Sequence, residues 1–388
     1  MNKKTLSTKV ACFSAALASL LATGCSGAGD SGFDTEVVGS QGEALTQSSY
    51  AFVWSSQLTG TFTAPDAYSS ASNNVVTWLS TGLYRVDFPN KGTQIGGDVQ
   101  VTAYGGTSER CKVDSWGSSG STLQVYVRCF TPSGTATNSL FTASYVGRAG
   151  VVGAEGGYVW ADQPSLTDYT PNTTYQWSST GGFNTIHRNS AGSYTVHLPG
   201  QTFTGGTVEV TAYGSGSEYC KVQGWGPGVS DQQVNVGCFT TTGAPVDARF
   251  TLVFSKGSPN YTPSYSYAWA SSPSSSWYTP SSTYQRGFIA GDGPVNGGFV
   301  TSPLATISRT GVGSYTVHLP QMSASGGTWG KSNAKVTGYG YDTSTCKIIG
   351  WYNSGDGVDA NVACRNAAGT LADAYYTITF STTQFIIG

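Results

Sequence analysis

The chain has 388 residues, of which 10% are charged and 13% aromatic, and its formal net charge is −2. Disordered chains combine low hydrophobicity with high net charge, so a chain of this composition is expected to fold. The small net charge gives no electrostatic reason to expect nucleic acid or an acidic membrane surface as a partner.

The first 24 residues have the pattern of a signal peptide. Three lysines within the first nine residues precede the apolar stretch "VACFSAALASLLA", which is shorter than the roughly 20 residues that span a bilayer. The segment ends in Ala-Thr-Gly-Cys at 22–25 and resembles the lipobox of bacterial lipoproteins, although that family prefers Leu where this chain has Ala22. The resemblance implies removal of residues 1–24 and lipidation of Cys25. With Ser26 next to it, the anchor is expected at the outer membrane or cell surface; ordinary cleavage would instead give a secreted protein.

A segment rich in small and polar residues follows at 25–48, and we expect it to be a flexible tether. Beyond it, six cysteines form pairs whose members are 18 residues apart. Equal spacing in an exported chain predicts three disulfides, Cys111–Cys129, Cys220–Cys238 and Cys346–Cys364. Each pair marks one copy of an internal repeat. We name these copies repeat 1 (49–146), repeat 2 (157–256) and repeat 3 (266–384, with insertions).

Each repeat has the same order of short motifs. An aromatic-x-Trp strand comes first, followed by a strand such as "GSYTVHLP" at 192–199 and 313–320, then V-x-V-T-x-Y-G, Cys-Lys-aliphatic-x-x-Trp and V-x-V-x-C. About seven alternating strands per 100 residues predict an all-β fold of three tandem antiparallel β-sandwiches, Ig-like or jelly-roll, each with one disulfide. The tryptophans that recur at fixed positions are expected in the cores: Trp54, Trp160 and Trp269 in the first strand, and Trp116, Trp225 and Trp351 after the first cysteine.

The cysteine hairpin also predicts a register. If Cys220 faces Cys238, then Val222 faces Val236, because the residue numbers have the same sum. Two further positions vary together: repeats 2 and 3 have an Arg before the quoted strand and an Asp after the second cysteine, whereas repeat 1 has Trp78 and Asn138. Because repeat 1 lacks both the Arg and the Asp, we predict that the two residues form a structural ion pair in each of the other repeats. The pairs are Arg188 with Asp247 and Arg309 with Asp373.

Two of the three histidines, His197 and His318, lie in the quoted strand, where repeat 1 has Asp87. Strand alternation places them opposite the inward-facing residues, so they are expected on the surface. No motif for a catalytic triad, metalloprotease or phosphate loop is present. We predict no catalytic residues, no metal, no cofactor and no enzymatic activity. Calcium in the loops at 291–298 and 356–361 is the alternative, but the EF-hand pattern is absent.

Aromatic residues that are missing from at least one repeat are the candidates for a contact surface: Trp177, Trp277, Tyr278, Trp329 and Tyr352. The region 49–384 resembles tandem domains of exported bacterial proteins without an assigned activity. We therefore expect a cell-surface lipoprotein whose repeats bind a glycan, matrix or protein ligand without catalysis. A structural envelope or spacer protein is the alternative, and a secreted hydrolase is less favoured. The expected partners are a membrane, through the lipid anchor, and a polysaccharide or surface protein.

Overall fold

The computed structural model describes most of the chain from Tyr50 to Thr382, namely residues 50–93, 96–147, 155–256, 264–289, 300–301, 304–324 and 331–382. Repeat 1 contains β1 (Tyr50–Ser55), β2 (Thr61–Thr63), β3 (Val75–Ser80), β4 (Leu83–Phe88), β5 (Asp98–Tyr104), β6 (Arg110–Ser119), β7 (Thr122–Phe130) and β8 (Leu140–Val146). Repeat 2 contains β9 (Gly156–Ala161), β10 (Asp168–Tyr169), β11 (Gln176–Ser178), β12 (Thr185–Ser190), β13 (Ser193–Pro199), β14 (Thr207–Tyr213), β15 (Tyr219–Pro227), β16 (Asp231–Phe239) and β17 (Arg249–Ser255). Repeat 3 contains β18 (Ser264–Ala270), β19 (Trp277–Tyr278), β20 (Gln285–Ile289), β21 (Val300–Thr301), β22 (Thr306–Gly311), β23 (Ser314–Pro320), β24 (Ser332–Tyr339), β25 (Thr345–Ser354), β26 (Gly357–Arg365) and β27 (Tyr375–Thr382). Short 3₁₀ turns lie at Asp66–Tyr68 and Thr173–Tyr175.

Each repeat is a β-sandwich, so the predicted all-β fold is confirmed. Its strands divide between two sheets, which we call inner and outer. In repeat 2 the inner sheet has the order β11-β9-β17-β14 and the outer sheet has the order β15-β16-β13-β12-β10, and repeats 1 and 3 follow the same plan. A separate apolar core lies between the two sheets of each repeat. The strand Ser193–Pro199 illustrates the local cause, because its residues alternate between buried and half-buried.

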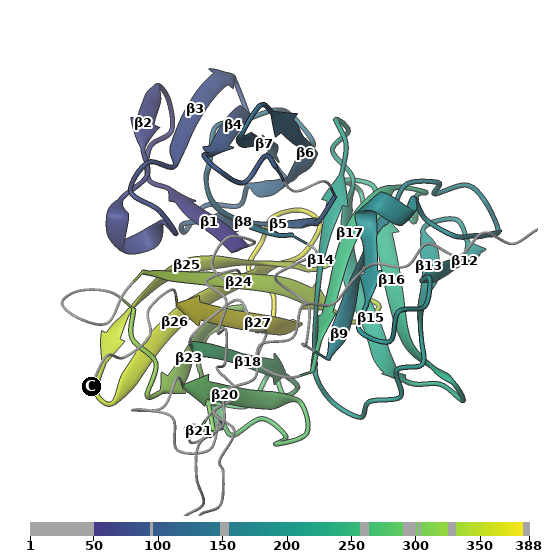
Figure 1. Cartoon of the computed structure of the whole chain (residues 1–388). Helices are drawn as coiled ribbons and strands as arrows, with labels where there is room; N and C mark the ends of the chain where they lie inside the picture. The colour runs from purple at the N-terminus through teal and green to yellow at the C-terminus, as the bar shows by residue number, and fades with distance from the viewer. Residues whose placement is uncertain are drawn as a thin grey trace, which may run out of the picture. The chain divides into compact units, whose positions relative to one another are not determined.

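The three repeats form a closed ring with pseudo-threefold symmetry. The outer sheet of each repeat continues into the inner sheet of the next repeat through one parallel strand contact (Figure 1). The same residues make the contact each time, and the last repeat joins the first: Val113 with Tyr213, Val222 with Tyr339, and Ile348 with Tyr104. The repeats are therefore parts of one closed assembly of strands as well as three sandwiches.

A threonine at the same position of each repeat bonds to the neighbouring repeat where the inner sheets meet. Its hydroxyl accepts a hydrogen bond from a valine amide of that neighbour, at 3.2–3.3 Å: Val101 to Thr211, Val210 to Thr337, and Val336 to Thr102. These threonines are the Thr of the repeated V-x-V-T-x-Y motif. The motif thus contributes to the contact between repeats as well as to the strand itself.

The tryptophans after the first cysteine, Trp116, Trp225 and Trp351, pack against the core of their own repeat, as predicted, and they also lie at the boundaries between repeats. Trp225 of repeat 2 makes edge-to-face contacts with Trp269, Tyr284 and Tyr339 of repeat 3, with ring centroids 5.5–6.1 Å apart. Matching clusters hold Trp116 against repeat 2 and Trp351 against repeat 1. Burying these large rings makes each boundary an apolar contact.

A β-bulge orients these tryptophans. The register of β15 and β16 shifts between Val222 and Gly224. Without the extra residue, Trp225 would point away from the face on which Val222 lies, because side chains alternate along a strand. With it, Trp225 faces Val234 on the core side of the sheet. The bulge occurs at the same place in all three repeats.

The three disulfides join directly opposite residues on neighbouring strands, and the predicted pairing is confirmed. Cys220 faces Cys238 and Val222 faces Val236, as the sequence register predicted. Gly192, the first residue of the quoted strand, has φ +68°, and a Cβ there would approach the carbonyl oxygen of Cys238 to 2.5 Å. This glycine therefore lets the turn pass close to the disulfide-bearing strand.

The arginines and aspartates that vary together are hydrogen-bonded. Arg188 contacts Asp247 through two bonds of 2.9 and 2.8 Å, and Arg309 contacts Asp373 in the same way at 2.9 Å. Repeat 1 has a neutral pair at these positions, in which the indole N–H of Trp78 donates to the Asn138 side-chain oxygen at 3.0 Å. One hydrogen-bonded contact is thus retained with different residues.

Candidate binding faces

The outer face of each outer sheet presents side chains in rows that cross the strands. In repeat 3 one row contains Tyr352, Asp359, His318 and Thr306, which lie opposite one another on β25, β26, β23 and β22. The next row contains Gly350, Asn361, Thr316, Ser308 and Trp277. Trp277 and Tyr352, two of the predicted contact residues, therefore lie on one face at opposite edges.

Both aromatic side chains of this face are open to solvent. Trp277 is 60% exposed and Tyr352 is 50% exposed. Strand alternation explains why, because their neighbours Tyr278 and Trp351 point inward and pack against the core of repeat 3. Neighbouring strands are about 4.8 Å apart, so the four steps from β25 to β19 separate the two residues by roughly 19 Å.

The strip between the two aromatics is polar. His318 contacts Asp359 through Nδ1 at 2.7 Å and Asp356 through Nε2 at 3.0 Å, and Thr316 donates to Asn361 at 2.8 Å. Burial by itself lowers the pKa of His318, but the two carboxylates outweigh it and the pKa lies above its ordinary value. The strip combines hydrogen-bond donors and acceptors without a strong net charge.

The corresponding face of repeat 2 is hollowed into a groove of about 770 Å³. His197 contacts Asp231 at 2.5 Å, and His187 contacts Asp168 of the edge strand β10 at 2.7 Å. The groove also has apolar walls, formed among others by Tyr169, Ile186, Pro199 and Val229. Its size lies within the range of small-ligand sites in proteins.

Repeat 1 has yet another set of side chains on this face. Asp87 stands at the position of His197 and His318, and it accepts hydrogen bonds from Arg85 at 2.9 Å and from Gln124 at 3.1 Å. The scaffold of the three faces is the same, but the side chains on them differ. The faces are thus suited to contact different ligands, or different parts of one ligand.

Among the described residues, the three histidines, His187, His197 and His318, are hydrogen-bonded to carboxylates and not to a hydroxyl or thiol. A catalytic nucleophile would need a hydroxyl or thiol hydrogen-bonded to the imidazole. The part of the chain that the structure describes also contains no group of three or more His, Cys, Asp or Glu side chains that could hold a metal ion.

The other predicted contact residues lie elsewhere. Trp177 is half-buried and packs against Tyr50, Phe52 and Tyr158 at the boundary of repeats 1 and 2. Tyr278 packs against the core of repeat 3, and burial raises its pKa to about 12. Trp329 lies outside the described residues, as do Cys25 and the loop 291–298. Of the predicted aromatics that the structure describes, Trp277 and Tyr352 are the two that lie on the same outer face.

A set of buried charges was missed at the level of the sequence. The lysine that follows the first cysteine of each repeat is buried and contacts a carboxylate of the next repeat, as Lys112 with Glu218, Lys221 with Asp342, and Lys347 with Glu109. The signal was present, because lysine recurs at one position in a chain with few charges. In repeat 3 the carboxylate lies four residues before the cysteine instead of two, which obscured the pairing.

No model of a known protein family matches the chain, and neither does any curated protein or solved structure. No helix in the described part of the chain is long and apolar enough to cross a membrane. The disulfides are typical of an oxidising compartment outside the cytoplasm. The function must therefore be argued from the outer faces themselves.

Proposed function

We propose that the protein is an exported, non-catalytic glycan-binding protein that is anchored to the outer membrane or cell surface through Cys25. The observation that carries the proposal is the outer face of repeat 3, where Trp277 and Tyr352 flank a polar strip. Flat aromatic rings offer apolar contact area to the C–H faces of a sugar, while their polar tips remain solvated.

The polar strip suits the hydroxyl groups of a sugar. Hydroxyls both donate and accept hydrogen bonds, and so require a mixture of donors and acceptors from the protein. His318, Asp359, Asn361 and Thr316 supply that mixture within two neighbouring rows. The separation of about 19 Å between the aromatics suits an oligosaccharide rather than a single sugar.

The closed ring weakens the spacer alternative. A spacer gains length from each added module, whereas these repeats lie around a common centre and pair with one another. The ring instead presents three outer faces from one chain. Linked faces raise the effective concentration of each for a polymeric ligand, so weak individual sites can give useful avidity.

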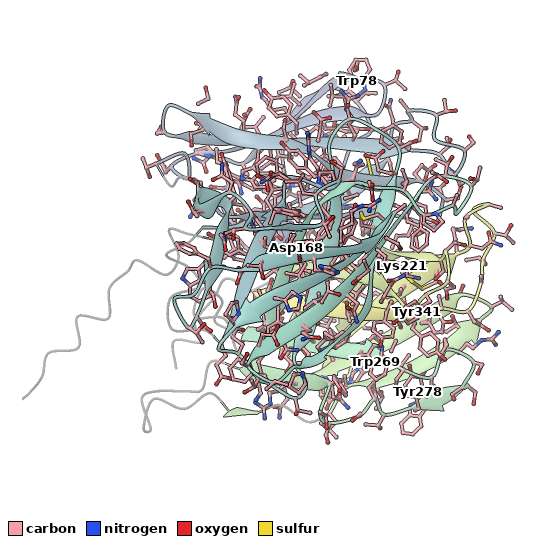
Figure 2. The ribbon with its side chains drawn as sticks, turned by 90° about the vertical axis from the view of Figure 1, so that its right-hand side faces the viewer. Trp78, Asp168, Lys221, Trp269, Tyr278 and Tyr341 are labelled. Carbon is pink, nitrogen blue, oxygen red and sulfur yellow. A yellow bond between two sulfur atoms is a disulfide. The ribbon has the colours of Figure 1, made fainter. Side chains whose placement is uncertain are left out.

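The proposal is tested with the purified full-length protein in a mild detergent, on a glycan array and then by calorimetry with the best oligosaccharide. We expect Trp277→Ala and Tyr352→Ala each to weaken binding about five-fold or more, because stacking contacts of this kind contribute roughly 1 kcal/mol or more beyond their buried area. Tyr341→Ala is the matched control, since Tyr341 is 74% exposed but lies near Lys221 (Figure 2) and belongs to neither row of this face. Binding of no glycan, or binding that neither variant changes, would contradict the proposal.

A further inference from the structure

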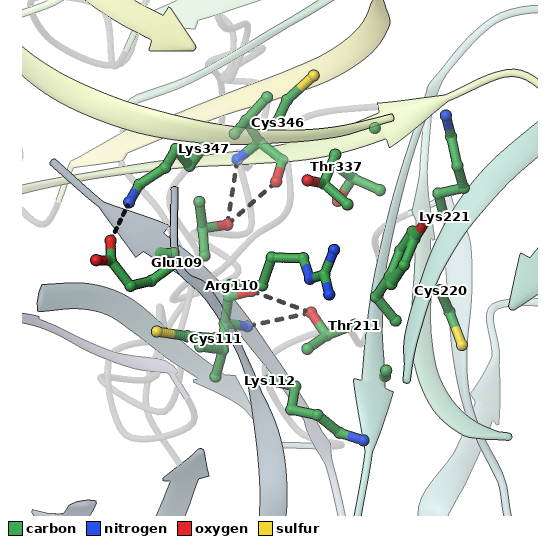
Figure 3. A pocket seen from close by; sticks show the side chains of 18 of the residues that line it. Glu109, Arg110, Cys111, Lys112, Thr211, Cys220, Lys221, Thr337, Cys346 and Lys347 are labelled. Atoms are coloured by element: carbon green, nitrogen blue, oxygen red, sulfur yellow. Dashed lines mark hydrogen bonds and ion pairs between the residues drawn. The ribbon is translucent and has the colours of Figure 1, made fainter. Parts of the chain in front are cut away.

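A second site lies where the three repeats meet. Strands β5, β14 and β24 and the starts of β6, β15 and β25 surround a pocket of about 80 Å³. Each repeat lines it with the same positions, those around the first cysteine and those in the V-x-V-T strand (Figure 3). Its volume is far below that of the groove in repeat 2, so it has space for one small chemical group and not for a sugar chain.

Most charges in this pocket are paired. Lys112, Lys221 and Lys347 each contact a carboxylate of the next repeat, at 2.7, 2.6 and 3.5 Å. Figure 3 shows the contact between Lys347 and Glu109 at one side of the pocket. These pairs leave no lysine of the pocket in surplus.

Two arginines of the pocket have no such partner. Among the described residues, neither Arg110 nor Arg365 forms an ion pair with a carboxylate. Arg110 lies 4.4 Å from the ring centre of Tyr219 and donates to the carbonyl oxygen of Pro132 at 3.0 Å. Figure 3 shows its side chain extending across the middle of the pocket.

Arg365 is held in a similar way, by backbone oxygens alone. It donates to the carbonyls of Gly369 at 2.9 Å and Gly106 at 2.6 Å. The Nε–H groups of both arginines are buried and have no acceptor within the described residues. A buried donor without an acceptor costs free energy, more so on a charged group, and a bound anion would remove that cost.

The other repeats indicate that these arginines are not needed for the fold. Repeats 2 and 3 have Tyr219 and Thr345 at the position of Arg110, and repeats 1 and 2 have Phe130 and Phe239 at the position of Arg365. The boundary of repeats 2 and 3, where neither arginine lies, has the same parallel strand contact as the other two boundaries. The positive charge is thus an addition to a pocket whose other charges are neutralised.

We propose that this central pocket binds one small oxyanion through the guanidinium groups of Arg110 and Arg365. Arginine presents N–H donors in a planar fork that matches two oxygens of a carboxylate, sulfate or phosphate. The anion accepts from the two Nε–H groups that lack an acceptor and neutralises the unpaired charge. It is either a free ion or the charged group of a larger molecule.

The test is isothermal titration calorimetry of the purified full-length protein with sodium sulfate, sodium phosphate and sodium acetate at constant ionic strength. We expect at least one anion to bind with a dissociation constant in the millimolar range or below. Arg110→Thr and Arg365→Phe, which install residues of the other repeats, are expected to weaken that binding about ten-fold or more, since hydrogen bonds to charged groups contribute roughly 1.5–3 kcal/mol. A glucuronate and a sulfated sugar then distinguish a free ion from the charged group of a glycan.

The control is Arg249→Gln, which removes one positive charge from an exposed position outside the pocket. It is expected to leave anion binding unchanged. Because sulfate stabilises proteins generally by exclusion from their surface, a change in melting temperature does not count as binding. If no anion binds, or if both pocket variants bind as the wild type does, the proposal is wrong, whatever the outcome of the glycan experiment.

Discussion

The Nζ atom of Lys347 in the last repeat lies 3.5 Å from Oε2 of Glu109 in the first repeat, which is 238 residues away in the chain. Lys112 with Glu218 and Lys221 with Asp342 are the same contact at the other two boundaries. One repeated lysine thus connects every repeat to the next and joins the end of the chain to its beginning.

The Lys221–Asp342 contact predicts strong coupling between two repeats. Lys221 is buried whereas Asp342 is half-exposed, so Asp342→Ala leaves a buried ammonium without its carboxylate and is expected to cost about 2–3 kcal/mol of unfolding free energy. Lys221→Met replaces the buried charge with an apolar chain and is expected to cost less. Denaturant unfolding of the double variant should then show less loss than the sum of the single losses.

The matched control for this cycle is Arg85 with Asp87, an ion pair on the outer face of repeat 1. Arg85 and Asp87 are partly exposed, and ion pairs near the surface contribute about 1 kcal/mol or less, so replacing both residues by alanine should change stability little. Additive losses at Lys221 and Asp342 would show that the two residues do not stabilise the boundary together.

Deletion of repeat 3 is expected to prevent folding rather than to shorten the protein. Trp54, Tyr68 and Tyr104 of repeat 1 pack against the core of repeat 3, and β5 and β15 each pair with a strand of that repeat. Ending the chain at Lys256 exposes these rings and both strand edges, which promotes aggregation. Light scattering and circular dichroism measure the outcome; a soluble two-repeat protein with a cooperative melting transition would refute the expectation.

The pair Arg188–Asp247 predicts a dependence of stability on acid. The hydrogen bonds from Arg188 lower the pKa of Asp247 most strongly, and those from the Gly192 amide and Tyr194 hydroxyl lower it further, while burial acts against them. A carboxylate with a lowered folded-state pKa stabilises the fold above its unfolded pKa of about 3.9, and this stabilisation is lost as pH falls through the lower folded value. Asp247→Asn should therefore lower the melting temperature at pH 7, and the difference from the wild type should shrink as the pH falls below about 3.9.

Repeat 1 provides a rescue for that variant. The combination Arg188→Trp with Asp247→Asn introduces the two residue types that repeat 1 has at these positions. There Trp78 and Asn138 form a neutral hydrogen-bonded pair. We expect this double variant to regain part of the lost thermal stability at pH 7. If Asp247→Asn melts at the same temperature as the wild type across the whole pH range, the ion pair has no structural role.

Asp98 lies near the centre of the ring and is expected to reduce stability at neutral pH. Burial raises its pKa to about 7, and the nearby carboxylate of Glu209 adds to the increase, whereas Gln100 and Lys335 lower it. The folded state holds a proton that the unfolded state has already released, so stability falls as pH rises from about 4 to 7.

Asp98→Asn removes this effect and is expected to increase stability at pH 8 by an amount on the order of 3 kcal/mol, with little change at pH 4. Repeat 3 has Asn333 at this position, so an asparagine is already accommodated at the equivalent site of the same fold. Denaturant unfolding at the two pH values measures the difference. An equal change at both would assign the effect to packing and not to ionisation.

Much of the fold was predictable because it depends on contacts close in sequence. The alternation in the strand at 193–199, the turn glycine Gly192 and the equal cysteine spacing are local features, and each follows from backbone geometry and strand periodicity. The hairpin register of Cys220 and Cys238 was predictable for the same reason. The candidate face was predictable only in part, since Trp277 and Tyr352 were identified as contact residues but so were Trp177 and Tyr278.

By itself, then, the sequence determined an all-β chain of three sandwiches, each with one internal disulfide. The tertiary structure decided how they are joined, because closure of the ring depends on contacts such as Lys347–Glu109 between residues that are far apart in the chain. It also decided which aromatics are covered. The bulge beside Val222 directs the Trp225 side chain to the boundary between repeats 2 and 3, while Trp277 at a sheet edge stays exposed. A one-residue shift in register reverses the face on which a side chain lies, and the alternation of residues in the sequence does not record that shift.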